Sequence, residues 1–142
     1  MDSVVPAPLS RLAYQVAGRF PEKAEITALP LPLAPGESGM VMHPRREKAT
    51  PIFVSYAAGS FYVEIGDALS DESSDHVPDA DAFAWALALV ENAAKFGAFK
   101  ISRYSRRGRV KSSYAFVPES REELLSVSLG QDERIDIRYE PW

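Results

Sequence analysis

Two stretches of the chain repeat apolar residues at helical spacing. In the first, roughly residues 9–19, apolar side chains recur at i, i+3, i+4 and i+7, and a glycine and a proline mark its end. The second, residues 79–96, is apolar over an arc of about 200°. A helix packed on one sheet needs roughly half that arc. The surplus flank, which carries Trp85, Leu89 and Phe96, therefore requires cover from the same chain or from a partner.

Elsewhere, apolar and polar residues alternate with the two-residue period of strands. In chain order, the predicted strands are 25–29, 39–43, 52–56, 61–65, 99–105, 110–117, 125–129 and 135–139. The last six form three hairpins, because glycine-bearing turns separate the members of each pair. Between the second and third hairpins, Ser120 begins a capping box that predicts a turn or two of helix.

This succession of elements predicts an α+β fold. We expect a single domain over residues 1–142, with a largely antiparallel sheet of about six to eight strands built from hairpins and the two main helices packed on it. Residues 67–78 are acidic and aperiodic, which predicts a mobile surface loop within the domain. Residues 29–38 are rich in proline, which indicates an extended loop or edge segment.

Composition narrows the functional classes. Of the 142 residues, 46% are hydrophobic, which is typical of a globular protein, and none is cysteine, which excludes disulfides and thiolate chemistry. No apolar run approaches the roughly 18 residues that span a bilayer. The first residues lack a basic region followed by an apolar one, so we expect a cytoplasmic protein with no secretory signal and no membrane contact.

The formal net charge of −4 conceals a strong asymmetry. Seven cations and no acid lie between Lys95 and Lys111, and subtracting their +7 from −4 leaves −11 on the rest of the chain. Six acids, with no Lys or Arg among them, lie between Asp67 and Asp81. The positive charge is densest at the predicted turn Arg106-Arg107-Gly108-Arg109, so the second hairpin is the candidate binding element.

The candidate partner-binding residues combine this hairpin with the surplus flank of the long helix. They are Arg103, Tyr104, Arg106, Arg107, Arg109, Lys111 and Trp85. Three interpretations stay open. A protein partner of mixed charge would be steered by a basic tip on an acidic molecule. Nucleic acid would use the arginines for phosphate and Tyr104 and Tyr114 for stacking, although the acidic remainder would repel it. The basic residues could also pair with the acidic stretch of the same chain.

Few residues of the kinds that carry catalysis are present. His43 lies beside a pair of arginines and, with Glu64, supplies the residue types for phosphodiester cleavage, so a small nuclease or hydrolase using His43 is a further alternative. His76 lies near Asp79 and Asp81, but their spacing matches no metal-binding pattern, and acids suit a helix N-terminus. We therefore expect a non-enzymatic protein with no catalytic residues, no cofactor and no metal site.

In size, acidity and lack of both cysteine and a catalytic set, the chain resembles the single-domain inhibitors and immunity proteins of bacterial conflict systems. The resemblance rests on composition and length, so it assigns no residue. It implies a small protein-binding module that occludes a partner's surface. A nucleic-acid-binding accessory protein that uses residues 103–111 is the alternative.

Overall fold

The computed structural model describes residues 6–28, 38–69 and 79–142, and in these residues the chain forms three helices and eight strands. The helices are α1 (Ala7–Arg19), α2 (Asp79–Phe96) and α3 (Arg121–Leu125). The strands are β1 (Ala24–Ala28), β2 (Ser38–Pro44), β3 (Ile52–Ala57), β4 (Ser60–Ile65), β5 (Ala68–Leu69), β6 (Ala98–Tyr104), β7 (Val110–Phe116) and β8 (Glu133–Tyr139). The predicted α+β fold is confirmed, and all strand pairs are antiparallel.

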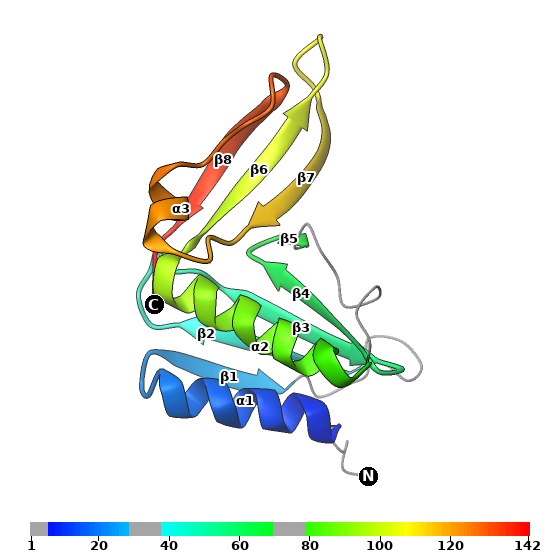
Figure 1. Cartoon of the computed structure of the whole chain (residues 1–142), viewed down its shortest axis with the longest axis vertical. Helices are drawn as coiled ribbons and strands as arrows, with labels where there is room; N and C mark the ends of the chain where they lie inside the picture. The colour runs from blue at the N-terminus through cyan, green and yellow to red at the C-terminus, as the bar shows by residue number, and fades with distance from the viewer. Residues whose placement is uncertain (1–5, 29–37, 70–78) are drawn as a thin grey trace.

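The strands are divided between two sheets rather than joined in one. β1 to β5 follow one another as a five-stranded sheet, and a three-stranded sheet has the order β7-β6-β8 (Figure 1). Between β5 and β6 the chain passes through α2, whose C-terminal end carries it away from the first sheet (Figure 1). Gly97 then takes the left-handed conformation, with φ at 80°, and redirects the chain into β6.

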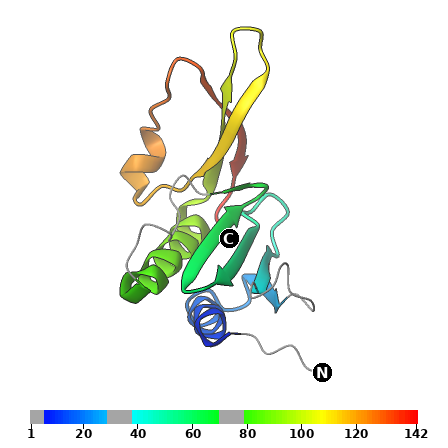
Figure 2. The same cartoon turned by 90° about the vertical axis from the view of Figure 1, so that its right-hand side faces the viewer.

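Helices α1 and α2 lie beside each other and pack against one face of the five-stranded sheet (Figures 1 and 2). Alternate residues of the strands supply that face, as in β4, where Phe61, Val63 and Ile65 are buried. From α1, the fully buried side chains are Leu9, Leu12 and Val16, spaced three and four residues apart as predicted.

The wide apolar arc of α2 is covered mainly by the same chain. Its buried residues are small: Ala82, Ala86, Val90, Ala93 and Ala94. Phe83 and Leu87, which the periodicity places at the centre of the buried face, are only partly buried, as are Trp85 and Leu89, and all four pack against the core. The guanidinium of Arg11 on α1 lies 4.6 Å from the centre of the Phe83 ring. Helix α1 thus supplies part of the cover that the arc requires.

The prediction of a third hairpin is wrong. Ser120 caps α3 as predicted, because its hydroxyl accepts a hydrogen bond from the backbone N–H of Glu123 at 3.1 Å. The following residues form no strand, and Leu125 and Leu129 are 80% and 40% exposed. β8 pairs instead with β6, which otherwise has an open edge. β6 pairs with β8 along nearly its whole length, from Ala98 opposite Tyr139 to Arg103 opposite Glu133, which is a longer ladder than residues 125–129 could provide.

The two sheets meet where Tyr139 of β8 packs on the loop between β4 and β5. Gly66 in that loop has φ at 65°, and a Cβ placed on it would lie 2.0 Å from the Tyr139 hydroxyl oxygen. At Gly97, a Cβ would lie 2.2 Å from the backbone oxygen of Tyr139. Both positions therefore require glycine, and they fix the three-stranded sheet against the rest of the molecule.

Trp142 also joins the parts of the fold. Its backbone N–H donates to the carbonyl of Ala94 at 2.9 Å, and its indole N–H donates to the carbonyl of Thr50 at 2.7 Å. The indole is 8% exposed and meets Phe20 edge to face, with the ring centres 5.7 Å apart. Trp142 therefore connects the end of α2 to the segment before β3 and to the residue after α1.

Within the described ranges, no helix is long and apolar enough to cross a membrane. The predicted acidic loop is described only at its start, where Asp67 is followed by β5. Residues 70–78 of that loop, and residues 29–37 of the predicted proline-rich segment, lie outside the described residues.

Candidate functional site

Strands β6 and β7 with their connecting turn form an arm, residues 98–116, that projects from the molecule. The turn of the arm is the part farthest from α1 and α2 (Figures 1 and 2). It is closed by two backbone hydrogen bonds: the N–H of Ser105 donates to the carbonyl of Arg109 at 2.7 Å, and the N–H of Gly108 donates to the carbonyl of Ser105 at 2.9 Å. Gly108 has φ at 79°, which confirms the predicted role of this glycine in the turn.

The positive charges on β6 are paired, whereas those of the turn and the start of β7 are not. Lys100 Nζ lies 2.8 Å from Asp67 Oδ2, and Arg103 Nε lies 3.4 Å from Glu133 Oε2. The tip cations, by which we mean Arg106, Arg107, Arg109 and Lys111, are exposed, and none forms an ion pair with a described residue. Internal pairing therefore accounts for the cations of β6 but not for the tip cations.

The two tyrosines of the arm are held by neighbouring side chains. Tyr104 donates a hydrogen bond to Asp136 at 2.5 Å, and the Arg134 guanidinium lies 4.9 Å from the centre of its ring. Tyr114 donates to Glu133 at 2.8 Å and also has an arginine guanidinium near its ring. Since a cation already lies against each ring, these tyrosines are parts of the arm's own structure rather than open stacking platforms.

A polar cluster joins β6 to β8 where their register shifts. The buried hydroxyl of Ser102 is hydrogen bonded to the Asp136 carboxylate and lies 2.8 Å from the Ser113 hydroxyl. The hydrogen bonds from Ser102 and then from Tyr104 hold the pKa of Asp136 below its usual range. Asp136 is thus a fixed negative charge at mid-arm, remote from the turn.

A second carboxylate is fixed beside the arm at Glu133. The backbone N–H of Gly130 donates to Glu133 Oε1 at 2.7 Å, and this bond, followed by that from Tyr114, lowers the pKa of Glu133. At the opposite edge of the arm's base, the hydrogen bond to Asp67 raises the pKa of Lys100. Glu133 and Lys100 are therefore both charged at neutral pH. Because the cations of β6 have acidic partners, the uncompensated positive charge of the arm lies in the tip cations.

The structure does not bring Trp85 to the basic residues. Trp85 lies in the N-terminal half of α2, is partly buried and packs against the core. The arm begins just beyond the other end of the same helix and points away from it (Figure 1). A partner that contacts the turn of the arm would therefore have to span the length of α2 to reach Trp85.

The residues proposed for hydrolysis are also apart. His43 is exposed on β2, and the strand register places Glu64 two strands across and two residues along, at a Cα separation of about 12 Å from strand spacing and rise. Because both side chains project out of the sheet rather than toward each other, this register does not bring them into hydrogen-bond contact. Arg46, one of the arginines beside His43, pairs with Glu140 at 3.3 Å. Among the described residues, no three His, Asp or Glu side chains are grouped so that they could hold a metal ion.

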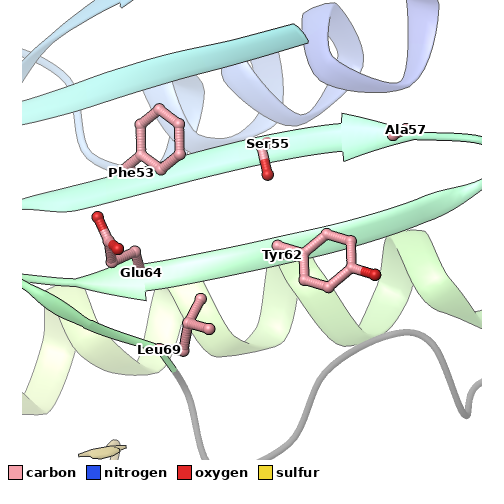
Figure 3. Close-up of a pocket in the computed structure, with 6 residues that line it drawn as sticks. All are labelled: Phe53, Ser55, Ala57, Tyr62, Glu64 and Leu69. Carbon is pink, nitrogen blue, oxygen red and sulfur yellow. The ribbon is translucent and has the colours of Figure 1, made fainter. Parts of the chain in front are cut away.

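Sequence reasoning missed a groove on the outward face of the five-stranded sheet. It has a volume of about 450 Å³ and is lined by Phe53, Ser55, Ala57, Tyr62, Glu64 and Leu69 (Figure 3). Phe53, Tyr62 and Glu64 alternate with the buried core residues of β3 and β4, and Ser55, which lies on the same face, is itself buried. The available indication was the outward position of two aromatic residues, because an outward strand face is ordinarily polar.

No family model, no curated protein and no solved structure matches this chain. Its function is therefore inferred from the arm, the groove and the chemistry of their side chains.

Proposed function

We propose that this protein is a non-enzymatic binding module that docks its arm against an acidic surface of a protein partner, as an inhibitor that occludes that surface would. The contrast along the arm supports this function best. Asp67 and Glu133 neutralise Lys100 and Arg103 of β6, while the tip cations are exposed and form no ion pair with any residue in the described ranges. Charge held at the end of a projecting hairpin is available to another molecule.

The chemistry of the tip suits carboxylates. An arginine guanidinium presents a planar fork that matches a carboxylate with two parallel hydrogen bonds, and three of the four tip cations are arginines. Val110 lies among them and is 56% exposed, so the same surface also presents apolar area. Binding surfaces of proteins combine such arginine and apolar contacts at their centres.

The rest of the molecule favours a protein over nucleic acid as the partner. Outside residues 95–111 the chain carries −11, which would repel a phosphate backbone beyond the immediate contact. Tyr104 and Tyr114 have cations against their rings and make internal hydrogen bonds, which reduces their use for base stacking. A protein surface needs only a local acidic patch to match the tip, and its association is accelerated by the opposite charges.

The test compares two triple variants that remove the same charge. The arm variant is Arg106→Ala/Arg107→Ala/Arg109→Ala, and the control, Lys23→Ala/Arg45→Ala/Lys48→Ala, removes three exposed cations from other elements. Proteins captured from a host lysate at low salt are quantified by mass spectrometry for the parent chain and both variants. A specific partner should be retained by the parent and the control and be depleted about threefold to 150-fold by the arm variant, given roughly 0.2–1 kcal/mol for each of three exposed pairs.

Equal retention by the arm variant would show that the arm is the wrong surface, and recovery of no specific protein would count against a protein-binding function. Duplex and single-stranded DNA are titrated in parallel. Saturable binding with a salt dependence of about −0.9 in log–log slope per neutralised duplex phosphate, lost in the arm variant, would assign the arm to nucleic acid instead.

A further inference from the structure

We propose that the groove on the outward face of the five-stranded sheet binds an organic cation with an apolar body, of the arylalkylammonium class, with Glu64 as the counter-charge. This site is separate from the arm and does not depend on the function proposed for the arm. It rests on the register of three strands, on the ion pairing of the molecule's acids and on the character of the groove walls.

The strand register gathers one carboxylate and several apolar groups on a small area. Phe53 of β3 and Leu69 of β5 lie directly opposite Glu64 of β4, one on each side. Tyr62 lies two residues from Glu64 on the same strand and therefore on the same face (Figure 3). Directly opposite residues have Cβ atoms about 5 Å apart and diagonal ones about 7–8 Å, so a single small ligand can contact all four side chains.

Of the four partly buried acids among the described residues, Glu91 and Glu133 form ion pairs, whereas Glu64 and Glu123 form none, and of these last two only Glu64 lines the groove. Glu91 and Glu133, whose side chains are 17% and 11% exposed, pair with Arg19 and Arg103 respectively. Glu64 is also partly buried, yet it forms no ion pair with any residue of the described ranges. A partly desolvated carboxylate gains from an opposite charge more than an exposed one does. The groove therefore holds an acceptor for a cation that the described chain does not supply.

The walls select the kind of cation. The rings of Phe53 and Tyr62 attract cations through their negative faces, and Leu69 adds aliphatic surface. A divalent metal would need several oxygen ligands, and among the described residues that line the groove Glu64 is the only carboxylate. The volume of about 450 Å³ lies in the range of roughly 300–1,000 Å³ that small organic ligands occupy. An ammonium group on an apolar body satisfies both the carboxylate and the walls.

The net charge of the molecule also favours a cationic ligand. The chain as a whole carries −4, so at long range it attracts a cation rather than an anion. Ser55, which lies directly opposite Tyr62, adds a hydroxyl that can accept a hydrogen bond from an ammonium group. The ligand class therefore follows from charge, size and hydrogen-bonding capacity together.

The test is an NMR titration of the ¹⁵N-labelled protein with 2-phenylethylammonium chloride and with its neutral analogue 2-phenylethanol. The ammonium should shift the amide signals of Phe53, Tyr62 and Leu69 saturably and bind about tenfold more tightly than the alcohol. Glu64→Gln keeps the size of the side chain and removes its charge, so it should reduce the affinity for the ammonium about tenfold and leave that for the alcohol unchanged. Glu25→Gln, an exposed acid of β1 outside the groove, is the matched control and should change neither.

A second variant tests the aromatic wall. Phe53→Leu keeps apolar volume and removes one ring, and it should weaken ammonium binding about threefold. Equal affinity for ammonium and alcohol, an unchanged affinity in Glu64→Gln, or shifts confined to residues outside the groove would each overturn the proposal, as would the absence of saturable shifts. The arm variant should bind the ammonium as the parent does, so failure of the arm's function leaves this result interpretable.

Discussion

Gly97 offers a test of how rigidly the arm is attached. It ends α2 with φ at 80°, and a Cβ placed on it would lie 2.2 Å from the backbone oxygen of Tyr139. Gly97→Ala therefore has two costs. The left-handed backbone costs an alanine about 1–2 kcal/mol. Relieving the overlap costs about 1–3 kcal/mol more, because the opposing atom belongs to the backbone of a strand paired with β6 and cannot rotate away. We expect the free energy of unfolding to fall by about 2–5 kcal/mol.

Gly108→Ala is the matched control. Gly108 has nearly the same backbone conformation, with φ at 79°, but no atom lies within 4 Å of the position that a Cβ would take. Only the backbone cost of about 1–2 kcal/mol applies. For a chain of this length, about 4 °C is lost per kcal/mol, so circular dichroism should show Tm falling by about 8–20 °C for Gly97→Ala and about 4–8 °C for Gly108→Ala. Equal losses would refute the conclusion that β8 lies hard against the end of α2.

Two further substitutions test contacts of β8 and of the C-terminal residue. Hydrogen bonds from Ser102 and Tyr104 lower the pKa of Asp136, so its carboxylate stabilises the fold above the ordinary value of about 3.9, and this contribution disappears as pH falls through the lower folded-state pKa. The urea midpoint of the parent protein should thus fall more between neutral pH and about pH 3 than that of Asp136→Asn. An equal fall in both proteins would contradict a stabilising role of the Asp136 carboxylate. Trp142→Ala, which removes a largely buried indole and its hydrogen bond, should cost about 3–5 kcal/mol in urea unfolding followed by fluorescence of Trp85; a loss near zero would show that Trp142 is not anchored.

Those features of the fold that depend on neighbours in sequence could be predicted. The helices 7–19 and 79–96 follow from apolar residues repeated at helical spacing, and the observed ranges agree with the predicted ones to within two residues. The cap at Ser120 and the turn at Gly108 follow from local chemistry, namely a hydroxyl three residues before an acid and a residue without Cβ. Each of these needs no knowledge of what lies across the fold.

Features that depend on partners far apart in the chain could not be predicted. The alternation in residues 125–129 has the period of a strand, yet β8 pairs with β6, whose residues lie 30 to 41 positions earlier, and the pairing includes a register shift. Periodicity does not specify which strands pair, so the division of the strands into two sheets could not be predicted from the sequence either.

The candidate site was limited in the same way. The sequence shows seven clustered cations. It does not show that Asp67 and Glu133 neutralise Lys100 and Arg103. The groove was hidden because Glu64 joins Phe53 and Leu69 only once three strands are paired in one register.

The contact of Tyr139 with Gly66 lies at the base of the three-stranded sheet, so it influences the direction in which the arm projects. From its base to the end of β6, the arm is about 23 Å long at the usual rise of a strand, so a tilt of about 5° at the base displaces the turn by about 2 Å. Trimming Tyr139 would change how the three-stranded sheet rests on the rest of the molecule without altering any of the tip cations. Selection for the geometry of a partner can therefore act on Tyr139 as well as on the tip cations.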